Sequence, residues 1–429
     1  MTGQTEKGGE AALVRGGGSL WRDRDFMVVW SGSLVSEMGD QVTMLALPLA
    51  AVLLLHAGAF ELGALRAAGS VAFLLIALPA GILVDRRRKR PLMIAADLGR
   101  LALIASVPAA AALKMLTLGQ LYVVALGAGM LSVIFDVSYQ SFVPVLVGRD
   151  RLHEGNSKMA LPSSFASVIG PTAAGALVAV AGAARAMTAD AASFGLGAAA
   201  TLVLRVREPA PAPAAERNMR AEIAEGLRYV FTHPVLRRVV GCTATANLFS
   251  SITFSILVLY LLRDLHADPA RIGQVFSLGS LGGLAGGLAA ARLVRLIGSA
   301  RMLWFSKAAF GWVALAMPFA RPGWGVLLVS AGMFVGSFSA VTYNVAQVSY
   351  RQSVTPPHLL GRMNASIRWV IWGTIPLGAL LGGWLGSVAG LRTTIAVGVT
   401  GTWLSVAWIM TSPLVRQRDI AVPEEVTAA

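Results

Sequence analysis

The chain has 429 residues, of which 55% are hydrophobic and 14% charged, about half the charged fraction of an ordinary soluble domain. Mean hydropathy is +0.67, and long apolar segments alternate with short charged loops, which is typical of a polytopic membrane protein. The net charge of +14 does not indicate a nucleic-acid-binding protein, because the basic residues lie in loops between apolar segments. The single cysteine, Cys242, excludes an internal disulfide framework.

Twelve membrane spans are predicted when the apolar segments are compared with the roughly 20 residues that a helix needs to cross hydrocarbon. They lie near residues 26–55, 61–84, 91–112, 117–143, 157–182, 186–204, 238–262, 271–294, 301–320, 323–347, 367–389 and 391–412. The first is too long for the apolar region of a cleavable signal, which has about 7–15 residues, so we expect it to be a true span. The pattern predicts an all-α membrane protein.

Residues 205–237 form the one long connection and divide six spans from six. Pro209, Pro211 and Pro213 predict a stiff linker, and the apolar residues of 221–231 share one face of an amphipathic surface helix. The expected domains are a tail at 1–25, helical bundles at 26–204 and 238–412 with the linker between them, and a second tail at 413–429.

The stretch Gly81-Ile-Leu-Val-Asp85-Arg86-Arg87-Arg88-Lys89-Arg90 follows the second span. A Lys or Arg at the bilayer centre costs about 2.5–3.5 kcal/mol, so five consecutive cations predict a polar turn at a membrane face. If both termini are cytoplasmic, about 27 of the 36 Lys and Arg residues fall on cytoplasmic segments. About seven fall on or near outer loops, namely Arg66, Lys114, Arg185, Arg263, Arg271, Arg321 and Arg392. Because positive loops favour the cytoplasmic side, we expect a multi-pass protein of the plasma membrane with both termini inside.

Glu37 and Asp40 lie near the middle of the first span, and their spacing of three places them on one helix face. An ionisable residue at that depth is costly and indicates a function by default. Desolvation favours the neutral form of a carboxyl group, which lets it exchange a proton between two states. Asp40 is our first candidate for proton coupling or for binding a substrate cation, and Glu37 is the second. The alternative is a carboxylate that fixes helix packing or pairs with a cation such as Arg66.

Two further groups of charged residues interrupt the spans. Asp97 and Arg100, also three residues apart, are expected to form a structural pair near the cytoplasmic end of the third span. Asp190 is expected near the outer end of the sixth span, where it caps a helix or meets an outer gate. Lys307 is expected to snorkel to the inner face.

Polar candidates in the seventh and tenth spans are few. They are Asn247, Tyr343, Asn344 and Gln347. A mostly apolar pocket with few polar anchors suits a large amphipathic molecule better than an ion. The five His residues have no metal-ligand spacing and no ATP-binding Gly-x4-Gly-Lys-[Ser/Thr] loop occurs, so we expect neither an enzyme nor a metal site.

The two halves of the chain echo each other in motif order. Gly81 to Arg86 has a weaker counterpart in Gly287 to Arg292, and Leu152 to Ser157 resembles Leu360 to Ala365. Such a repeat predicts a six-plus-six duplication, the architecture of a transporter with a cavity between its halves.

The turn from Gly81 to Arg90 resembles the signature of the major facilitator superfamily between helices 2 and 3. The resemblance implies twelve transmembrane helices in two pseudo-symmetric six-helix bundles. It also implies a conformational latch, in which Asp85 faces the start of helix 11 near residues 364–368, and Arg90 or Arg86 reaches Asp136. The alternative is that the turn only anchors the topology.

Other stretches resemble the branch that includes the enterobactin exporter, macrolide efflux proteins and transmembrane secretion effectors. They are Phe135-Asp136-Val-Ser-Tyr139-Gln140, Leu152 to Asn156, Asp190-Ala-Ala-Ser193-Phe194, Glu225-Gly226-Leu-Arg228-Tyr229, and Thr355-Pro356 through Asn364. The resemblance covers nearly everything from Leu20 to about Pro413.

Gly170-Pro171 with Gly175, in the fifth span, resembles the antiporter motif of drug exporters. Small residues let helices approach closely, and Pro permits a bend; the alternative is generic tight packing. The resemblance implies a monomeric secondary transporter that exports a drug, siderophore or secondary metabolite, driven by a proton gradient without a cofactor. The alternatives are uptake of an organic solute by proton symport, and a membrane sensor or scaffold that does not transport.

Overall fold

The computed structural model describes residues 19–206, 208 and 219–420, and these residues contain helices and connections but no strand. The N-terminal half contains η1 (Leu20–Arg22), α1 (Arg24–Leu55), α2 (Ala59–Arg86), α3 (Lys89–Ala112), α4 (Leu118–Val147), η2 (Arg149–Arg151), α5 (Leu152–Ala181) and α6 (Ala183–Leu202). The long connection contains α7 (Met219–Thr232). The C-terminal half contains α8 (Leu236–Arg263), α9 (Pro269–Ile297), α10 (Ser299–Phe305), η3 (Ser306–Phe310), η4 (Trp312–Phe319), α11 (Gly325–Val354), α12 (Pro357–Val388), α13 (Leu391–Leu404), α14 (Ala407–Met410) and η5 (Pro413–Arg416).

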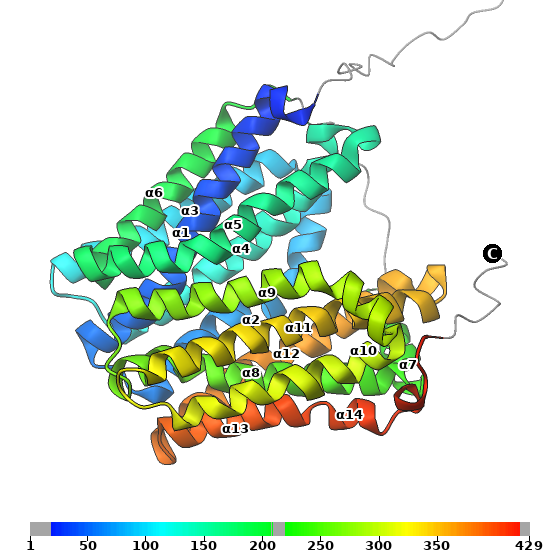
Figure 1. Cartoon of the computed structure of the whole chain (residues 1–429). Helices are drawn as coiled ribbons and strands as arrows, with labels where there is room; N and C mark the ends of the chain where they lie inside the picture. Colours follow the sequence, from blue (N-terminus) through cyan, green and yellow to red (C-terminus); the bar gives the residue numbers. More distant parts are fainter. Residues whose placement is uncertain (1–18, 207, 209–218, 421–429) are drawn as a thin grey trace, which may run out of the picture.

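The predicted fold class is confirmed: the protein is an all-α membrane protein built from two groups of antiparallel helices (Figure 1). Eleven helices in the described part of the chain are long and apolar enough to cross a membrane. The remaining expected span, α6, is not among them, because its 20 residues are rich in Ala and Gly and include Arg185 and Asp190. Its length still corresponds to about 30 Å, and it packs along α1 and α3 inside the N-terminal half.

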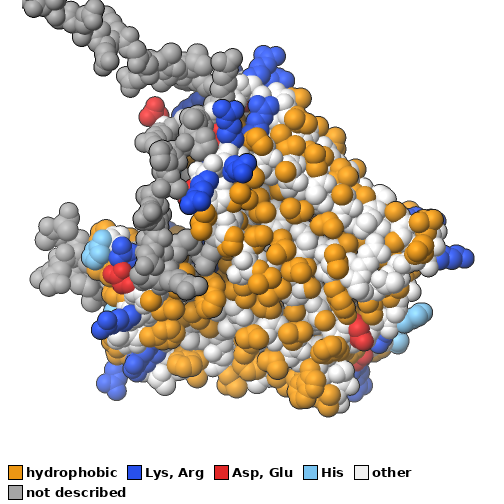
Figure 2. Space-filling model, turned by 180° about the vertical axis from the view of Figure 1, so that it is seen from behind, with side chains coloured by type: hydrophobic (Ala, Val, Ile, Leu, Met, Phe, Trp, Pro, Cys, Tyr) orange, Lys and Arg blue, Asp and Glu red, His pale blue; other side chains and the backbone are white. Residues whose placement is uncertain are grey.

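The two ends of the helical body differ in what they carry. The described chain ends at Ser19 and Ile420 lie at one end together with α7, and we name this end the terminal face (Figure 1). The opposite face carries short connections such as His56–Gly58 and Gly182. Figure 2 shows a broad hydrophobic band between two charged ends, with many Lys and Arg side chains near the terminal face. This band is the surface that a bilayer would cover.

Two helix connections are alike at matching places in the two halves, which supports the predicted duplication. Gly182 joins α5 to α6 with φ +85°, and Gly390 joins α12 to α13 with φ +84°. Both turns need a left-handed backbone that only glycine adopts at little cost. They join the last two spans of each half, so the same turn chemistry recurs at matching places.

The ninth span is irregular. It begins as α10, continues as a π-helical turn at Ser306–Phe310 and ends as the 3-10 helix η4. The carbonyl of Ser306 accepts a hydrogen bond from the Ser339 hydroxyl at 2.7 Å, and that of Ala308 accepts one from the Trp403 indole at 3.4 Å. Neighbouring helices therefore satisfy backbone groups where the helix is distorted, as a membrane interior requires. Lys307 lies within this turn.

The helix α7 lies where the amphipathic surface helix is expected, and it packs against α12. Glu225 on α7 pairs with Arg362 at 2.5 Å, and the Ser366 hydroxyl donates to the carbonyl of Ile223 at 3.0 Å. The helix α12 starts at Pro357, ten residues before the span expected from 367, because proline is tolerated in a first turn and α7 supports the extension. The linker prolines at 209, 211 and 213 and the outer parts of both tails lie outside the described residues.

Candidate functional site

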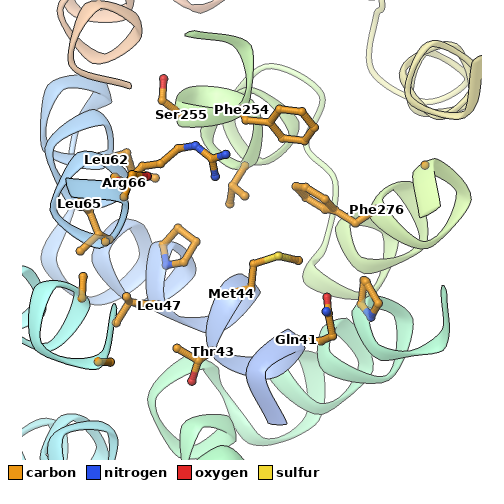
Figure 3. A pocket seen from close by; sticks show the side chains of 18 of the residues that line it. Gln41, Thr43, Met44, Leu47, Leu62, Leu65, Arg66, Phe254, Ser255 and Phe276 are labelled. Carbon is orange, nitrogen blue, oxygen red and sulfur yellow. Dashed lines mark hydrogen bonds between the residues drawn. The ribbon is translucent and has the colours of Figure 1, made fainter. Parts of the chain in front are cut away.

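A hollow of about 620 Å³ lies between the two halves. Its wall is formed by α1 to α5 on one side and by α8, α9 and α11 on the other. Most of the lining is apolar, with Leu62, Phe254 and Phe276 among its members, and Gln41 and Thr43 supply polar groups (Figure 3). A cavity of this size and character can hold an amphipathic small molecule.

Arg66 is the one ionisable side chain in the lining of this hollow within the described part of the chain. Figure 3 shows its guanidinium reaching from α2 toward Phe254 on α8, and the Cζ atom lies 5.5 Å from the centre of that ring. The expectation that Arg66 lies on or near an outer loop is therefore wrong. Arg66 lies within α2, and its side chain lines the hollow between the halves. It makes no ion pair with Asp40, whose charged neighbours are Arg100, Asp190, Glu37 and Asp136.

The halves touch closely toward the opposite face. A Cβ atom added to Gly63 on α2 would lie 2.5 Å from the carbonyl oxygen of Ala379 on α12, and one added to Gly175 on α5 would lie 2.5 Å from that of Pro269 on α9. The Thr172 hydroxyl donates to the Ser277 hydroxyl at 2.8 Å across the same boundary. Backbones can approach this closely only where side chains are absent or small. The hollow is therefore closed on this side.

The glycine–proline segment of α5 contributes to this closure. Gly170 faces Gln41 of α1, with the Gln41 Cγ 2.4 Å from the position that a Cβ would take. The carbonyl oxygen of Pro171 lies 2.2 Å from the position of a Cβ on Gly273 of α9. The three residues Gly170, Pro171 and Gly175 thus join the cavity wall to the contact between the halves. Their part in antiport stays a prediction.

Toward the terminal face the two groups of helices diverge (Figure 1). A Cβ on Gly81 of α2 or on Gly361 of α12 would meet nothing within 4 Å. The last ring contact between these two helices on the way to this face joins Phe73 and Trp372, whose centres lie 4.2 Å apart. The halves are therefore apart on the side where the basic turn lies.

The expected latch residues are separated in this arrangement. Asp85 and Arg86 are exposed. The Arg90 guanidinium donates to the carbonyl of Thr201 at 2.9 Å and to that of Leu202 at 2.6 Å, both at the end of α6. Asp136 is also exposed, and the cations that act on it are Arg100 and Arg368.

The N-terminal half contains a cluster of carboxyl groups around a single guanidinium. Arg100 on α3 forms a buried ion pair with Asp97, and its guanidinium lies 4.5 Å from the ring centre of Phe135 and 4.2 Å from that of Phe194. Its charge also acts on the carboxyl groups of Glu37, Asp40, Asp136 and Asp190. Five acidic side chains from α1, α3, α4 and α6 therefore share one cation, and a proton on any of them changes the balance of the rest.

Asp190 lies fully buried in this cluster, at the contact of α6 with α1. Its Oδ1 accepts a hydrogen bond from Ser193 at 3.2 Å, and the Thr43 hydroxyl of α1 also lies near this carboxyl group. Gly39 on α1 makes room for it, since a Cβ there would lie 2.5 Å from Oδ1. Asp190 is therefore a buried member of the acidic cluster around Arg100, and it does not cap a helix at the outer end as expected.

The polar candidates of the C-terminal half lie apart from the main hollow. Tyr343 is buried and donates to the carbonyl of Val239 at 3.2 Å. The Gln347 amide donates to the Asn344 side chain at 2.9 Å. Asn247 lines a smaller hollow of about 160 Å³ that we name the annex.

Lys307 is 6% exposed and also lines the annex, with its ammonium 5.1 Å from the ring centre of Tyr343. It does not snorkel to a surface as expected, because the π-helical turn directs it into the C-terminal half.

A profile of the transmembrane secretion effector family matches residues 19–425. The chain belongs to the transmembrane secretion effector family. Among curated relatives, the multidrug efflux pump Tap of Mycolicibacterium fortuitum is 27% identical over 407 residues, covering 92% of this chain and 97% of Tap. This transmembrane secretion effector is thus a membrane transport protein and not an enzyme, as predicted.

Solved transporters share its fold at low sequence identity. A bacterial homologue of the iron transporter ferroportin in an inward-facing state superposes with a TM-score of 0.71 and 16% identity, covering 91% of this chain and 98% of that one. The ferroportin homologue in an outward-facing state gives 0.56 and 16%, covering 90% and 98%.

Sequence reasoning did not place Arg66 in the cavity, and it gave Arg100 one acidic partner where the structure gives it several. The signal for Arg66 and Lys307 was available, since each is a lone cation inside an apolar segment, but the sequence placed Arg66 near an outer loop and Lys307 at the inner face. Arg100 was assigned only to Asp97, because helix periodicity finds partners along one helix and not across several.

Proposed function

We propose that this transmembrane secretion effector is a proton-coupled exporter that carries a small amphipathic molecule by alternating access. The observation that carries the proposal is the mostly apolar hollow between the halves beside the carboxyl cluster around Arg100. The relationship to the multidrug efflux pump Tap supports export.

The side on which the hollow is open indicates the conformational state of the transporter. We assign the terminal face to the cytoplasm and the protein to the plasma membrane, with both termini inside, because the basic turn and most cations lie at that face. The hollow is then closed outside and open inside. The higher TM-score with the inward-facing ferroportin homologue supports this assignment. The transporter acts as a monomer in this proposal.

Asp40 is the proposed proton carrier, with Glu37 second. Both are half-buried on α1, near the cavity residues Gln41 and Thr43 of the same helix, and both feel the charge of Arg100. Proton uptake there neutralises one acid of the cluster and thereby changes how strongly α1, α3, α4 and α6 attract one another. Proton binding is coupled to transport if protonation of the cluster stabilises the outward-open state more than the inward-open state.

Closure of the inner side is assigned to the latch. The helix α12 begins at Pro357, so residues 364–368 lie inside it and not at its start as expected. When the halves approach at the terminal face, Asp85 can approach this N-terminal part of α12, where the helix dipole favours a carboxylate. Arg90 or Arg86 can then reach Asp136. In the present arrangement these groups are apart, as an inward-open state requires.

The proposal is tested by flux in proteoliposomes under an imposed pH gradient, with a panel of amphipathic fluorescent dyes. Wild-type protein should expel dye against the proton flow, and Asp40→Asn should abolish this flux at unchanged protein levels. Asp150→Asn, an exposed carboxylate on η2, is the matched control and should transport normally.

Full export by Asp40→Asn would refute the role of that residue. Flux in the same direction as the protons would identify an uptake symporter instead, and no gradient-dependent flux of any compound would favour a sensor or scaffold.

A further inference from the structure

The charge in the central hollow is one-sided. Arg66 is exposed to it, and no Asp or Glu is among the residues that line it. None of the described residues forms an ion pair with the Arg66 guanidinium, whose Cζ atom lies 5.5 Å from the centre of the Phe254 ring. A cation at this depth therefore faces a cavity without a counter-charge.

Arg100, a second deep cation, shows that the fold can pair such a charge. Arg100 is held by Asp97 and lies between two aromatic rings. A guanidinium in an apolar membrane protein is costly unless an anion compensates it. Retaining Arg66 without such a partner, in the wall of a binding cavity, is consistent with an anion that arrives with the ligand.

The annex adds to this polarity. Three residues line both hollows, namely Phe254, Met333 and Ser337, so the annex adjoins the main cavity. Among the described residues that line the annex, Lys307 carries a charge and the others, such as Asn247 and Thr402, are neutral. Two cations and no carboxylate thus border the connected space.

The carboxyl groups of the cluster lie outside the lining of both hollows, which contains none of Glu37, Asp40, Asp136 and Asp190. Their charges are shared with Arg100 in the N-terminal half. The fold thus separates an acidic compartment, suited to protons, from a cationic one, suited to an anion.

We propose that the transported molecule is an amphipathic organic acid whose carboxylate binds the Arg66 guanidinium while its apolar body lies against Phe254 and neighbouring side chains. This rests on the proposed function, since it names the substrate class of the same cavity. The planar guanidinium offers paired donors to a carboxylate. Lys307 strengthens the attraction from the annex.

The test measures equilibrium binding to the purified full-length protein, without any gradient, of two matched probes: dansyl-phenylalanine and its uncharged amide. A charge-assisted hydrogen bond in such a site is worth about tenfold or more in affinity. Wild-type protein should bind the acid at least about tenfold more tightly than the amide. Arg66→Gln should remove that preference and leave the affinity for the amide unchanged, while Arg66→Lys should restore part of it.

Two further variants sharpen the result. Lys307→Met should weaken binding of the acid by a smaller factor than Arg66→Gln, because Lys307 does not line the main hollow. Arg185→Gln removes an exposed cation at the start of α6 and should change neither affinity.

Equal binding of acid and amide by wild-type protein would overturn the proposal, as would an equal loss of both on Arg66→Gln. If proton-driven efflux of neutral or cationic dyes is found without any preference for the acid, this inference fails and the proposed function stands. If the acid is preferred but no flux occurs, the proposed function fails and the anion site stands.

Discussion

At the scale of single residues, the arrangement around Arg100 shows how a membrane interior tolerates several acids. The guanidinium has one direct ion pair, with Asp97, and two aromatic faces that replace the water it has lost. Its Nε atom and the Asp97 Oδ2 atom remain buried without hydrogen-bond partners. Such incomplete satisfaction in a dry region is tolerated where a function needs it.

Replacing Arg100 by Met should destabilise the protein by about 3–5 kcal/mol, because removing one member of a buried ion pair leaves an uncompensated charge. Thermal unfolding in detergent measures the loss. The double variant Arg100→Met with Asp97→Asn should be more stable than Arg100→Met alone, since it leaves no lone carboxylate from the pair. Equal stability of the two would show that Asp97 is not the partner that matters.

At the scale of helices, close approach of α5 to α9 and of α2 to α12 decides where the cavity ends. The contacts rest on glycine, because a single added carbon would overlap backbone atoms of the facing helix. Hydrophobic periodicity predicts only that these glycines lie in helices. Their positions on facing helices let the two halves close the cavity at this side.

The pair Gly273 and Gly287 on α9 provides a sharp test. A Cβ on Gly273 would lie 2.2 Å from the carbonyl oxygen of Pro171, whereas one on Gly287 would lie 3.8 Å from a methyl carbon of Val341. Gly273→Ala should therefore prevent closure at the opposite face and lower flux at least about tenfold, while Gly287→Ala should transport normally.

The cause of that loss can be checked separately. A cysteine placed at Ser277 in a Cys242→Ser background should react with an impermeant thiol reagent from the opposite face more rapidly when Gly273→Ala is present. An unchanged labelling rate together with normal flux in Gly273→Ala would show that this contact does not gate transport.

At the scale of the whole molecule, the charge distribution gives the protein a direction. The terminal face carries the basic turn between α2 and α3, the chain ends and α7, and an apolar band separates it from the opposite face (Figures 1 and 2). Because Arg66 lies inside the protein and not at an outer loop, the excess of cations on the terminal face is larger than loop counting from the sequence indicates.

Site-directed labelling of intact cells measures this direction. In a Cys242→Ser background, Arg87→Cys should react with an impermeant thiol reagent only after the membrane is permeabilised. Lys114→Cys, on the exposed connection between α3 and α4 at the opposite face, should react in intact cells. The reverse pattern would place the termini outside and turn the proposed exporter around.

The sequence by itself determined the class, the spans and the family resemblance of this protein. These depend on local properties: the length of an apolar segment, the position of a charged turn and the order of short motifs. Span length and loop charge act one segment at a time when a helix enters the bilayer. It also placed Glu37 and Asp40 at a depth where a charge needs an explanation. Only the tertiary structure decided that Arg66 faces the cavity, that Lys307 turns inward at a π-helical turn and that Arg100 serves acids on four helices. Those relations arise where helices distant in the chain cross, and a pattern along one helix contains no information about which face another helix presents to it.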